Sequence, residues 1–356
     1  MTASLSKIPR DKDFETKKIL KKIVITRAAL AELKWVSDAL PNKSILISTL
    51  SLQEAKDSSA IENIITTNDE LFRSDSITQQ FTSLAAKEVY NYAEALREWY
   101  ISMKKTWILR NKDILNIQAK IEQNRAWFRT LPGTSLKNDQ TGEIIYVPPQ
   151  HPEEISLLMD DLVTFINTPH PLGLDPLVCV AIIHHQFESI HPFYDGNGRT
   201  GRILNILYLV KEWLLHTPIL YLSRYINKNK ADYYRLLQSV RTDNTWEEWI
   251  LFLLEGIEVT AIETIELIGK IRELMLSQKN IIRTKLPKIY SQDLLNNIFK
   301  HPYTKIDFMV KDIWKGRITA TKYLDQLCSI WILEKIRLWK ENFYIHTALF
   351  KLLQDI

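Results

Sequence analysis

The sequence predicts a mainly α-helical protein with one short β-hairpin and a distinct helical unit at its C-terminal end. Only nine of the 356 residues are glycine, and long stretches repeat apolar residues every three or four positions, as amphipathic helices do. With 46% hydrophobic residues, the chain is long enough to bury a sizeable core and to divide into two or three domains. We place these domains at 1–110, 111–280 and 283–356.

Helical periodicity accounts for most of the first two domains. Asp175-Pro176 marks a favourable helix start, because proline suits the first position of a helix. From Arg199 onward, apolar residues such as Ile203 and Leu207 recur at helical spacing. Helices are predicted at 12–40, 51–64, 78–107, 113–129, 153–167, 175–190, 199–212, 231–242 and 246–279.

After about residue 283 the character of the chain changes. Three helix-sized units, at 291–300, 304–314 and 319–331, precede two strand-like segments, 332–338 and 342–346, joined at Lys340-Glu341. This order resembles a winged helix, in which 318–333 would be the recognition helix. On DNA, the groove-facing or phosphate-facing side chains would be Lys315, Arg317, Thr319, Thr321, Lys322 and Gln326, with Leu324, Leu327 and Trp331 in the core.

Residues 191–202, HPFYDGNGRTGR, form the chemically densest segment. Asp195 to Gly198 are strong turn formers, and the helix at 199–212 follows them directly. A glycine-bracketed turn at a helix N-terminus presents free backbone N–H groups and the positive end of the helix dipole, which together bind anions. Phosphate is therefore the expected ligand.

The side chains of this loop suit a nucleotide and its metal ion. Arg199 and Arg202 lie three residues apart, and guanidinium groups bind phosphate oxygens in bidentate fashion. Asp195 offers a hard oxygen ligand for a magnesium ion held mainly by phosphates and water. His191 is the nearby group whose ordinary pKa suits proton abstraction near neutral pH.

The same loop matches the Fic-family signature HxFx(D/E)GNGRxxR at every specified position, so the chain resembles that family. The resemblance implies a Fic-fold helical bundle that transfers AMP from ATP, with Mg²⁺, to a Ser, Thr or Tyr hydroxyl of a target protein or of itself. It implies His191 as the base, Asp195 as the metal ligand and Phe193 as the anchor of the loop. Related phosphorylating members carry lysine at the second glycine, so Gly198 favours AMP transfer. The implied nucleotide-binding residues of the loop are Gly196, Asn197, Gly198, Arg199, Thr200, Gly201 and Arg202.

A second match lies upstream, in the helix predicted at 51–64. Ser58 and Glu62 share a helical face and, with Asn63, resemble the Fic inhibitory motif (S/T)xxxE(G/N). We expect Glu62 to pair with Arg199 and to block seating of the ATP γ-phosphate, because an ion pair occupies the donor that should orient the phosphates. Two other interpretations of Ser58 and Glu62 remain open: an ordinary Ser-Glu helix surface, and a glutamate that positions a water molecule for removal of AMP.

Residues 134–149 are expected to form the β-hairpin flap of the Fic fold. Asp139, Gln140, Thr141 and Gly142 suit the tip, Ile144, Ile145 and Tyr146 the returning strand, and Pro148-Pro149 its end. The resemblance implies that its edge holds an extended target segment by main-chain pairing. A plain connecting hairpin with buried Ile and Tyr is the alternative.

The region 221–237 is expected to contribute to the base pocket. Tyr225 would stack on adenine and Asn229 would hydrogen-bond it, while Tyr233 and Tyr234 would pack inward.

Two other functional classes remain open. His184, Glu188 and His191 would stack as metal ligands on a continued helix, which suggests a metal-dependent phosphodiesterase, although Pro192 favours ending the helix there. The unit at 283–356 suggests a DNA-binding regulator instead.

Composition limits the partners and the cellular compartment that we expect for this protein. A net charge of +4 does not demand nucleic acid as a partner. Cys179 and Cys328 are too few for a disulfide framework or a thiolate zinc site, and we see no signal peptide or membrane-spanning run, so we expect a cytoplasmic protein. A homodimer is among the expected assemblies.

Overall fold

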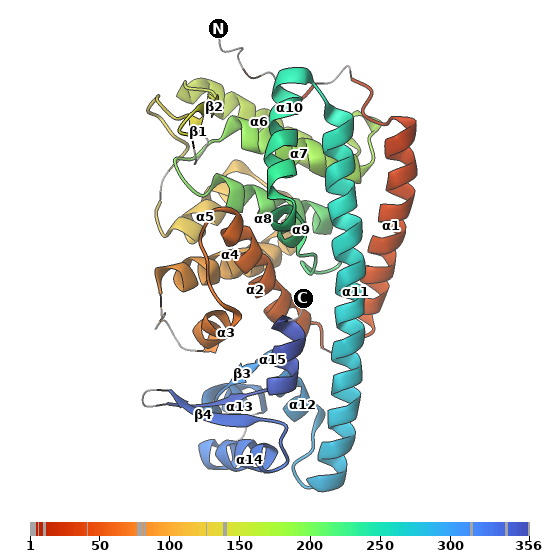
Figure 1. Cartoon of the computed structure of the whole chain (residues 1–356), viewed down its shortest axis with the longest axis vertical. Coiled ribbons are helices and arrows are strands. Elements are labelled where there is room, and N and C mark those ends of the chain that lie inside the picture. The colour runs from red at the N-terminus through yellow and green to blue at the C-terminus, as the bar shows by residue number, and fades with distance from the viewer. Residues whose placement is uncertain are drawn as a thin grey trace.

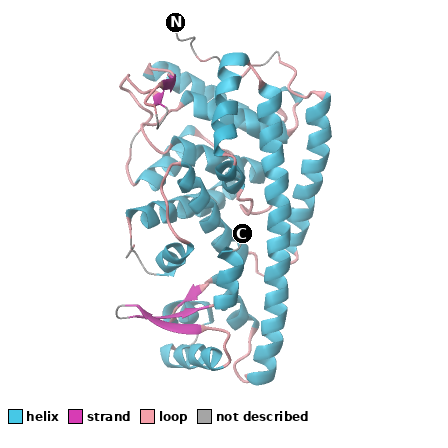
Figure 2. Ribbon diagram, in the orientation of Figure 1, coloured by secondary structure: helices cyan, strands magenta, loops and turns pink. Residues whose placement is uncertain are grey.

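The computed structural model describes residues 5, 7–9, 12–40, 42–76, 81, 83–125, 127–137, 141–313, 316–338 and 341–354. Helices make up most of this part of the chain, and Figure 2 shows the strands confined to two places, so the predicted mainly α fold class is confirmed. None of the described helices is both long enough and apolar enough to cross a membrane.

Most predicted helices form close to their expected bounds, and α3 and α9 are added to them. The helix predicted at 113–129 is an exception, because it ends at Glu122, where Gln123 turns into the left-handed conformation with φ of 54°. The inhibitory helix, α2, begins earlier than predicted and ends at Ile61, so Glu62 is its C-cap and Asn63 lies beyond it. Up to residue 285 the helices are α1 (Lys17–Asp38), α2 (Ser44–Ile61), α3 (Asn68–Ser76), α4 (Leu84–Thr106), α5 (Asn111–Glu122), α6 (Pro152–Asn167), α7 (Pro176–Ile190), α8 (Asn197–Lys211), α9 (Leu222–Lys228), α10 (Lys230–Asp243) and α11 (Trp246–Lys285).

The 40-residue helix α11 is the longest element and spans about 60 Å at the usual rise per residue. It runs along one side of the molecule, with α1 beside its first half and the C-terminal unit at its far end (Figure 1). The other helices before residue 246 lie on the opposite side of α11 from α1 (Figure 1).

The centre of the bundle is the antiparallel pair α7 and α8. Every residue of α7 is buried, which fits the apolar residues on all sides of its first half, 176–183, whereas its second half buries polar side chains beside the motif loop. Gly201 allows α8 to approach α7 closely, because a Cβ atom there would lie 2.6 Å from Glu188 Oε1. The loop that joins these two buried helices is the 191–196 segment of the motif.

The C-terminal unit contains α12 (Gln292–Lys300), β3 (Tyr303–Thr304), α13 (Ile306–Ile313), α14 (Arg317–Ser329), β4 (Glu334–Leu338), β5 (Glu341–Ile345) and α15 (Thr347–Gln354). Its sheet has the antiparallel order β3-β5-β4, with Ile336 opposite Phe343. The three helices and the strand pair lie where the sequence predicts them, and β3 and α15 were not predicted. Lys315 and Lys340 lie outside the described residues.

One core prediction in this unit is wrong. Leu324 and Leu327 are fully buried as expected, but the Trp331 side chain is 91% exposed. Trp331 follows the end of α14 in a left-handed conformation, with φ of 64°, and so leaves the helical face on which the two leucines lie.

The C-terminal unit packs against the inhibitory helix. The side-chain amide of Gln53 in α2 donates to the Leu353 carbonyl oxygen of α15 over 2.9 Å, and Tyr303 donates to the Asp69 carboxylate of α3. Helix α2 also contacts α4, α8 and α9, so several elements fix its position.

We predict that Trp249→Ala lowers the free energy of unfolding by about 3–5 kcal/mol, because the ring is fully buried beside α7 and its N–H donates to the Ala181 carbonyl oxygen over 2.9 Å. Urea unfolding followed by circular dichroism measures this loss. Trp127→Ala is the control, since that side chain is 70% exposed and its removal should cost within about 0.5 kcal/mol. Equal losses in the two variants would contradict the packing described here.

Candidate active site

The motif loop is shaped by two residues in left-handed conformation. His191 ends α7 with φ of 49°, and its N–H donates to the Phe187 carbonyl oxygen over 3.0 Å. Gly196 precedes α8 with φ of 79°, a conformation that favours glycine. Between them, the Asn197 side chain accepts from the Phe193 N–H at 2.9 Å and donates to the Phe193 carbonyl oxygen at 2.8 Å. The loop is thus closed by its own backbone and one amide.

The loop is anchored in the core by Phe193, as predicted. Its side chain is 1% exposed and its ring lies against those of Phe128 and Phe187. A rigid anchor fixes the distance between His191 and the start of α8.

The first turn of α8 is the expected anion site, and a carboxylate lies over it. A Cβ atom on Gly198 would overlap the Glu62 carboxylate and would also lie 2.9 Å from Arg202 Nη1. On the other side of the turn, a Cβ atom on Gly196 would lie 2.6 Å from Glu122 Oε1. Both glycines therefore leave room for an acidic group above the helix N-terminus.

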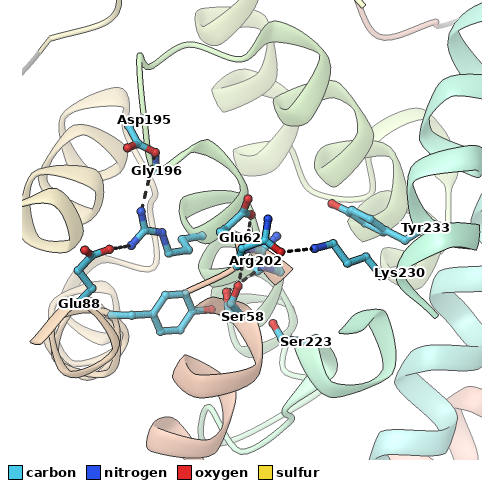
Figure 3. Close-up of polar contacts among 12 residues, drawn as sticks. Ser58, Glu62, Glu88, Asp195, Gly196, Arg202, Ser223, Lys230 and Tyr233 are labelled. Carbon is cyan, nitrogen blue, oxygen red and sulfur yellow. Dashed lines mark hydrogen bonds and ion pairs between the residues drawn. The ribbon is translucent and has the colours of Figure 1, made fainter. Parts of the chain in front are cut away.

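Arg202 is buried and fully engaged by the end of α2 (Figure 3). Its Nη2 donates to Glu62 Oε1 over 2.7 Å and to the Ser58 carbonyl oxygen over 2.9 Å, and its Nε donates to Ser58 Oγ over 2.8 Å. The Arg202 side chain is 2% exposed and that of Glu62 33%. Although burial opposes ionisation of Glu62, the charge and hydrogen bond of Arg202 lower the pKa of that carboxyl.

Arg199 has a different set of partners. Its Nη1 donates to Glu88 Oε2 of α4 over 2.9 Å, and its Nη2 donates to Glu122 Oε1 of α5 over 2.7 Å. Asp195 Oδ1 lies 3.8 Å from the same Nη2. The Arg199 side chain is 3% exposed, whereas that of Asp195 is 78% exposed, with its Oδ1 accepting from the Gly196 N–H over 2.6 Å.

The imidazole of His191 is half-buried, and its Nδ1 has no hydrogen-bond partner among the described residues. Burial, together with the positive charges of Arg241 and Arg129, lowers the pKa of His191 to about 4. At neutral pH the ring is therefore uncharged and carries a free lone pair, as a general base requires.

The predicted hairpin forms, with β1 (Leu136–Lys137) antiparallel to β2 (Ile144–Tyr146). Tyr146 docks it on α7: the hydroxyl donates to the Ser189 carbonyl oxygen over 2.9 Å, and Arg241 lies over the ring, with its guanidinium carbon 4.0 Å from the centroid. Ile144 and Ile145 are 54% and 45% exposed, so neither is the core residue of the alternative reading. Asp139 and Gln140 of the predicted tip lie outside the described residues.

Three family models match this chain. The model described as Fic/DOC family matches residues 108–209, which include the hairpin and the whole motif loop. The model described as Fic/DOC family N-terminal matches residues 20–99, which include α2, so the two models together match just over half of the chain. The chain belongs to the Fic/DOC family. The model described as protein adenylyltransferase SoFic-like, C-terminal domain, matches residues 274–349.

Curated relatives of this Fic chain carry the name protein adenylyltransferase Fic. The protein from Drosophila yakuba is 30% identical over 149 residues, which cover 42% of this chain and 28% of the relative. The Drosophila ananassae protein is 32% identical over 93 residues, which cover 26% of this chain and 18% of the relative. The aligned segments thus span less than a third of each relative.

Solved structures share the Fic fold of this chain. A Fic family protein from Desulfovibrio desulfuricans G20 has a TM-score of 0.56 at 20% identity, covering 93% of this chain and 96% of that one. Fic-1 from C. elegans has a TM-score of 0.54 at 20% identity, covering 70% of this chain and 74% of the solved one.

The predicted pairing of Glu62 with Arg199 is wrong: Glu62 pairs with Arg202. Both arginines lie in the first turns of the Fic helix α8, but they meet different neighbours. Glu88 and Glu122, from α4 and α5, already hold Arg199, and the C-terminal end of α2 reaches only the side of α8 on which Arg202 lies. Asn63, next to Glu62, accepts from Lys230 Nζ over 3.1 Å.

Other predicted site residues have structural partners. Tyr225 lies against Phe252 of α11, with ring centroids 5.2 Å apart, and the Asn229 side chain donates to the Tyr225 carbonyl oxygen over 2.9 Å, so contact with adenine stays a prediction for both. Thr200 is fully buried. Tyr233 packs inward as expected, but Tyr234 is 44% exposed, which corrects that prediction.

The alternative metal site does not form. Within the described residues, no group of three or more His, Cys, Asp or Glu side chains is arranged to hold a metal ion. His184 Nε2 is instead hydrogen-bonded to the Tyr233 hydroxyl at 2.9 Å, and α7 ends before His191.

The sequence did not reveal the residues that support the loop from other elements. Arg129 is fully buried, and its Nε donates to the His191 carbonyl oxygen over 2.8 Å, which neutralises the C-terminal end of α7. Glu88 and Glu122 hold Arg199. Each is a single charged residue in a helix or loop far along the chain from the motif, and no local pattern distinguishes it from a surface residue.

Glu54 is a buried carboxyl on α2, two helical turns before Glu62. It accepts from the Tyr92 hydroxyl over 3.0 Å and from the Ser223 N–H over 3.0 Å, and the Ser223 hydroxyl also donates to it. Burial raises the pKa of Glu54 to about 7, although these hydrogen bonds act in the opposite direction. Glu54 thus joins α2 to α4 and α9 without a cationic partner.

We predict that the free energy of unfolding of Glu54→Gln, relative to that of the wild type, is higher at about pH 8 than at about pH 5. The native state holds the Glu54 proton more tightly than the unfolded chain does, so its contribution is complete below the ordinary pKa of 4.5 and is lost as the pH rises through about 7. For a pKa shift of this size, the contribution of Glu54 to the free energy of unfolding changes by at most about 3 kcal/mol over the whole titration. Urea unfolding of both proteins across this range measures it, and a difference independent of pH would contradict the assignment to Glu54.

Proposed function

We propose that this protein is an adenylyltransferase that transfers AMP from ATP to a Ser, Thr or Tyr hydroxyl of a target protein, itself included. The observation that carries the proposal is the His191 imidazole held, by one loop closed through Asn197, beside a helix N-terminus with two buried arginines. The names of the curated relatives and of the C-terminal family model agree with this activity.

In the proposed reaction, His191 accepts the proton of the target hydroxyl, and the hydroxyl oxygen bonds to the α-phosphorus of ATP. The bond from that phosphorus to the oxygen bridging to the β-phosphate breaks, and pyrophosphate leaves. Free N–H groups of the first turn of α8, with Arg199 and Arg202, stabilise the negative charge on the phosphates. The loop supplies orientation, because Asn197 and Phe193 fix its shape.

The donor set beside the turn suits Mg²⁺ bound together with phosphates. Asp195 offers an exposed carboxylate, and hard oxygen ligands are those that Mg²⁺ prefers. Asp195 would hold the ion, whose charge would offset that of the phosphates.

The hairpin supports a protein as the substrate. The outer strand β2 carries the exposed Ile144 and Ile145, and Tyr146 fixes it to α7 just before His191. An extended target segment paired along this strand would bring its hydroxyl to the imidazole.

The end of α2 supports autoinhibition. Three of the five N–H donors of Arg202 are bound by Ser58 and Glu62, and the Glu62 carboxylate covers Gly198 at the start of α8, where its negative charge would repel a phosphate. Departure of Glu62 would uncover the turn and release one of the Arg202 donors.

We do not propose DNA binding. The exposed face of α14 combines Thr321, Lys322 and Gln326 with Asp325 and Ile318, and a carboxylate beside an apolar side chain is not the basic surface that duplex DNA requires.

A cytoplasmic location stays a prediction, consistent with two free cysteines, Cys179 and Cys328.

We predict that His191→Ala lowers the rate of AMP transfer by roughly 100-fold or more, because the variant lacks the proton acceptor. ATP binding, measured by isothermal titration calorimetry, should change little. His170→Asn is the control: this exposed residue precedes α7, at the helix end remote from the loop, and asparagine tolerates its left-handed conformation. Intact mass spectrometry after incubation with ATP and Mg²⁺ follows the added adenylyl mass. Full activity in His191→Ala would overturn the mechanism.

We predict that Glu62→Gly raises the rate of AMP incorporation at least about tenfold, since loss of an ion pair worth about 1.4 kcal/mol suffices for that factor. Glu212→Gly is a matched control, because Glu212 is likewise the C-cap of a helix, α8, with φ of −83° against −88° for Glu62. Its activity should equal that of the wild type. Unchanged incorporation in Glu62→Gly, with His191 intact, would count against autoinhibition by Glu62 but not against the transfer reaction.

A further inference from the structure

Helix α1 carries an exposed apolar stripe from Leu20 to Trp35. Leu20, Val24 and Trp35 are 47%, 70% and 73% exposed, and the exposed Ala28 and Ala31 lie between them. The spacing of four, four, three and four residues keeps these side chains on one face of a helix, as in a coiled-coil seam. The opposite face, with Ile19, Ile23, Leu30 and Leu33, is buried.

Such a stripe is unusual on a free surface. Single exposed apolar residues are common, but a continuous row that includes a tryptophan marks an interaction site. In Figure 1, α1 is the outermost helix beside α11, so its outer face is open to another molecule.

The charges of α1 divide into two groups. Those directed toward the rest of the chain are paired within it: Lys18 Nζ lies 2.8 Å from Glu247 Oε1, Lys22 Nζ 2.7 Å from Glu258 Oε2, and Arg27 Nε 2.7 Å from Asp175 Oδ2. Lys17, Lys21 and Glu32 have no ion-pair partner in the described part of the chain, and all three are exposed. At 100° per residue, Lys17 lies in line with the stripe, one turn before Leu20, whereas Lys21 and Glu32 lie on the same flank of it.

The stripe is symmetric about the midpoint between Arg27 and Ala28. Leu20 and Trp35 lie equally far from that point on either side, and so do Val24 and Ala31. A two-fold axis through the midpoint would therefore set Leu20 against Trp35, and Val24 against Ala31, of a second copy. The same axis brings the flank of one copy against the same flank of the other, with Lys21 and Glu32 offset by only about 3 Å.

We propose that α1 pairs antiparallel with α1 of a second copy of this chain. Apolar contact along the stripe supplies the affinity, with Trp35 as its anchor, and two Lys21–Glu32 ion pairs fix the direction and register. The self-complementary charge and spacing favour a second copy over an unrelated protein, because one surface satisfies both sides of an isologous contact.

The proposed contact leaves the candidate active site accessible. Figure 1 shows α1 on the side of α11 that faces away from β1, β2 and α8, so a second copy docked there would not cover the hairpin or the loop. The proposed dimer and the proposed transfer reaction can therefore be tested separately.

Sedimentation velocity of the full chain over a range of concentrations tests the surface. We expect a concentration-dependent dimer in the wild type and a monomer for Trp35→Glu. Leu157→Glu is the control, because Leu157 is 61% exposed on the separate helix α6, and it should dimerise as the wild type does. Circular dichroism establishes that all variants are folded. A monomeric wild type at every concentration, or a dimer that Trp35→Glu leaves intact, overturns the proposal.

Charge reversal tests the direction of pairing. Lys21→Glu alone and Glu32→Lys alone each set like charges together and should dissociate the dimer at least about tenfold more readily, a factor that corresponds to about 1.4 kcal/mol. In a dimer of one Lys21→Glu copy and one Glu32→Lys copy, residue 21 of each copy again meets an opposite charge at residue 32 of the other. An equal mixture of the two variants should therefore dimerise again. A mixture that stays as dissociated as its components, or single variants that dimerise as the wild type does, refutes the antiparallel register.

Discussion

A buried guanidinium needs carboxylates or carbonyl oxygens around it, and this constraint organises the centre of the molecule. Arg199 and Arg202 begin a helix that is buried on all sides, and they are 3% and 2% exposed. Both meet carboxylates from other elements, Glu88 and Glu122 for Arg199 and Glu62 for Arg202, whereas the buried Arg129 is held by carbonyl oxygens. The start of α8, which we propose as the phosphate site, is thus lined by acidic side chains from three other helices or their ends.

Helix α2 connects this site to the rest of the protein. Its C-terminal end reaches Arg202 through Ser58 and Glu62, its buried Glu54 reaches α4 and α9, and its Gln53 reaches the last helix of the C-terminal unit. Because one rigid helix carries all these contacts, the position of the Glu62 carboxylate depends on packing about two helical turns away. The pair between Glu62 and Arg202 is local, but the geometry that produces it is not.

Much of the fold follows from periodicity, since helices of 15 to 40 residues with buried faces leave a clear apolar pattern, as in α7 and α11. Short elements such as β3, two residues long, leave none, and their existence depends on a partner strand. Trp331 shows the same limit, because an apolar residue next to a helix end joins the core only if the chain continues in helical conformation.

The sequence by itself determined the chemistry of the motif loop, because His191, Asp195, Gly196, Arg199 and Arg202 lie within twelve contiguous residues whose turn and helix propensities fix their relative positions. It also determined that Ser58 and Glu62 share a helical end. Only the tertiary structure decided that Glu62 meets Arg202 and not Arg199, and that Arg129 holds the His191 carbonyl. The two arginines are alike in sequence, and which acid reaches which depends on the helices packed on each side of α8.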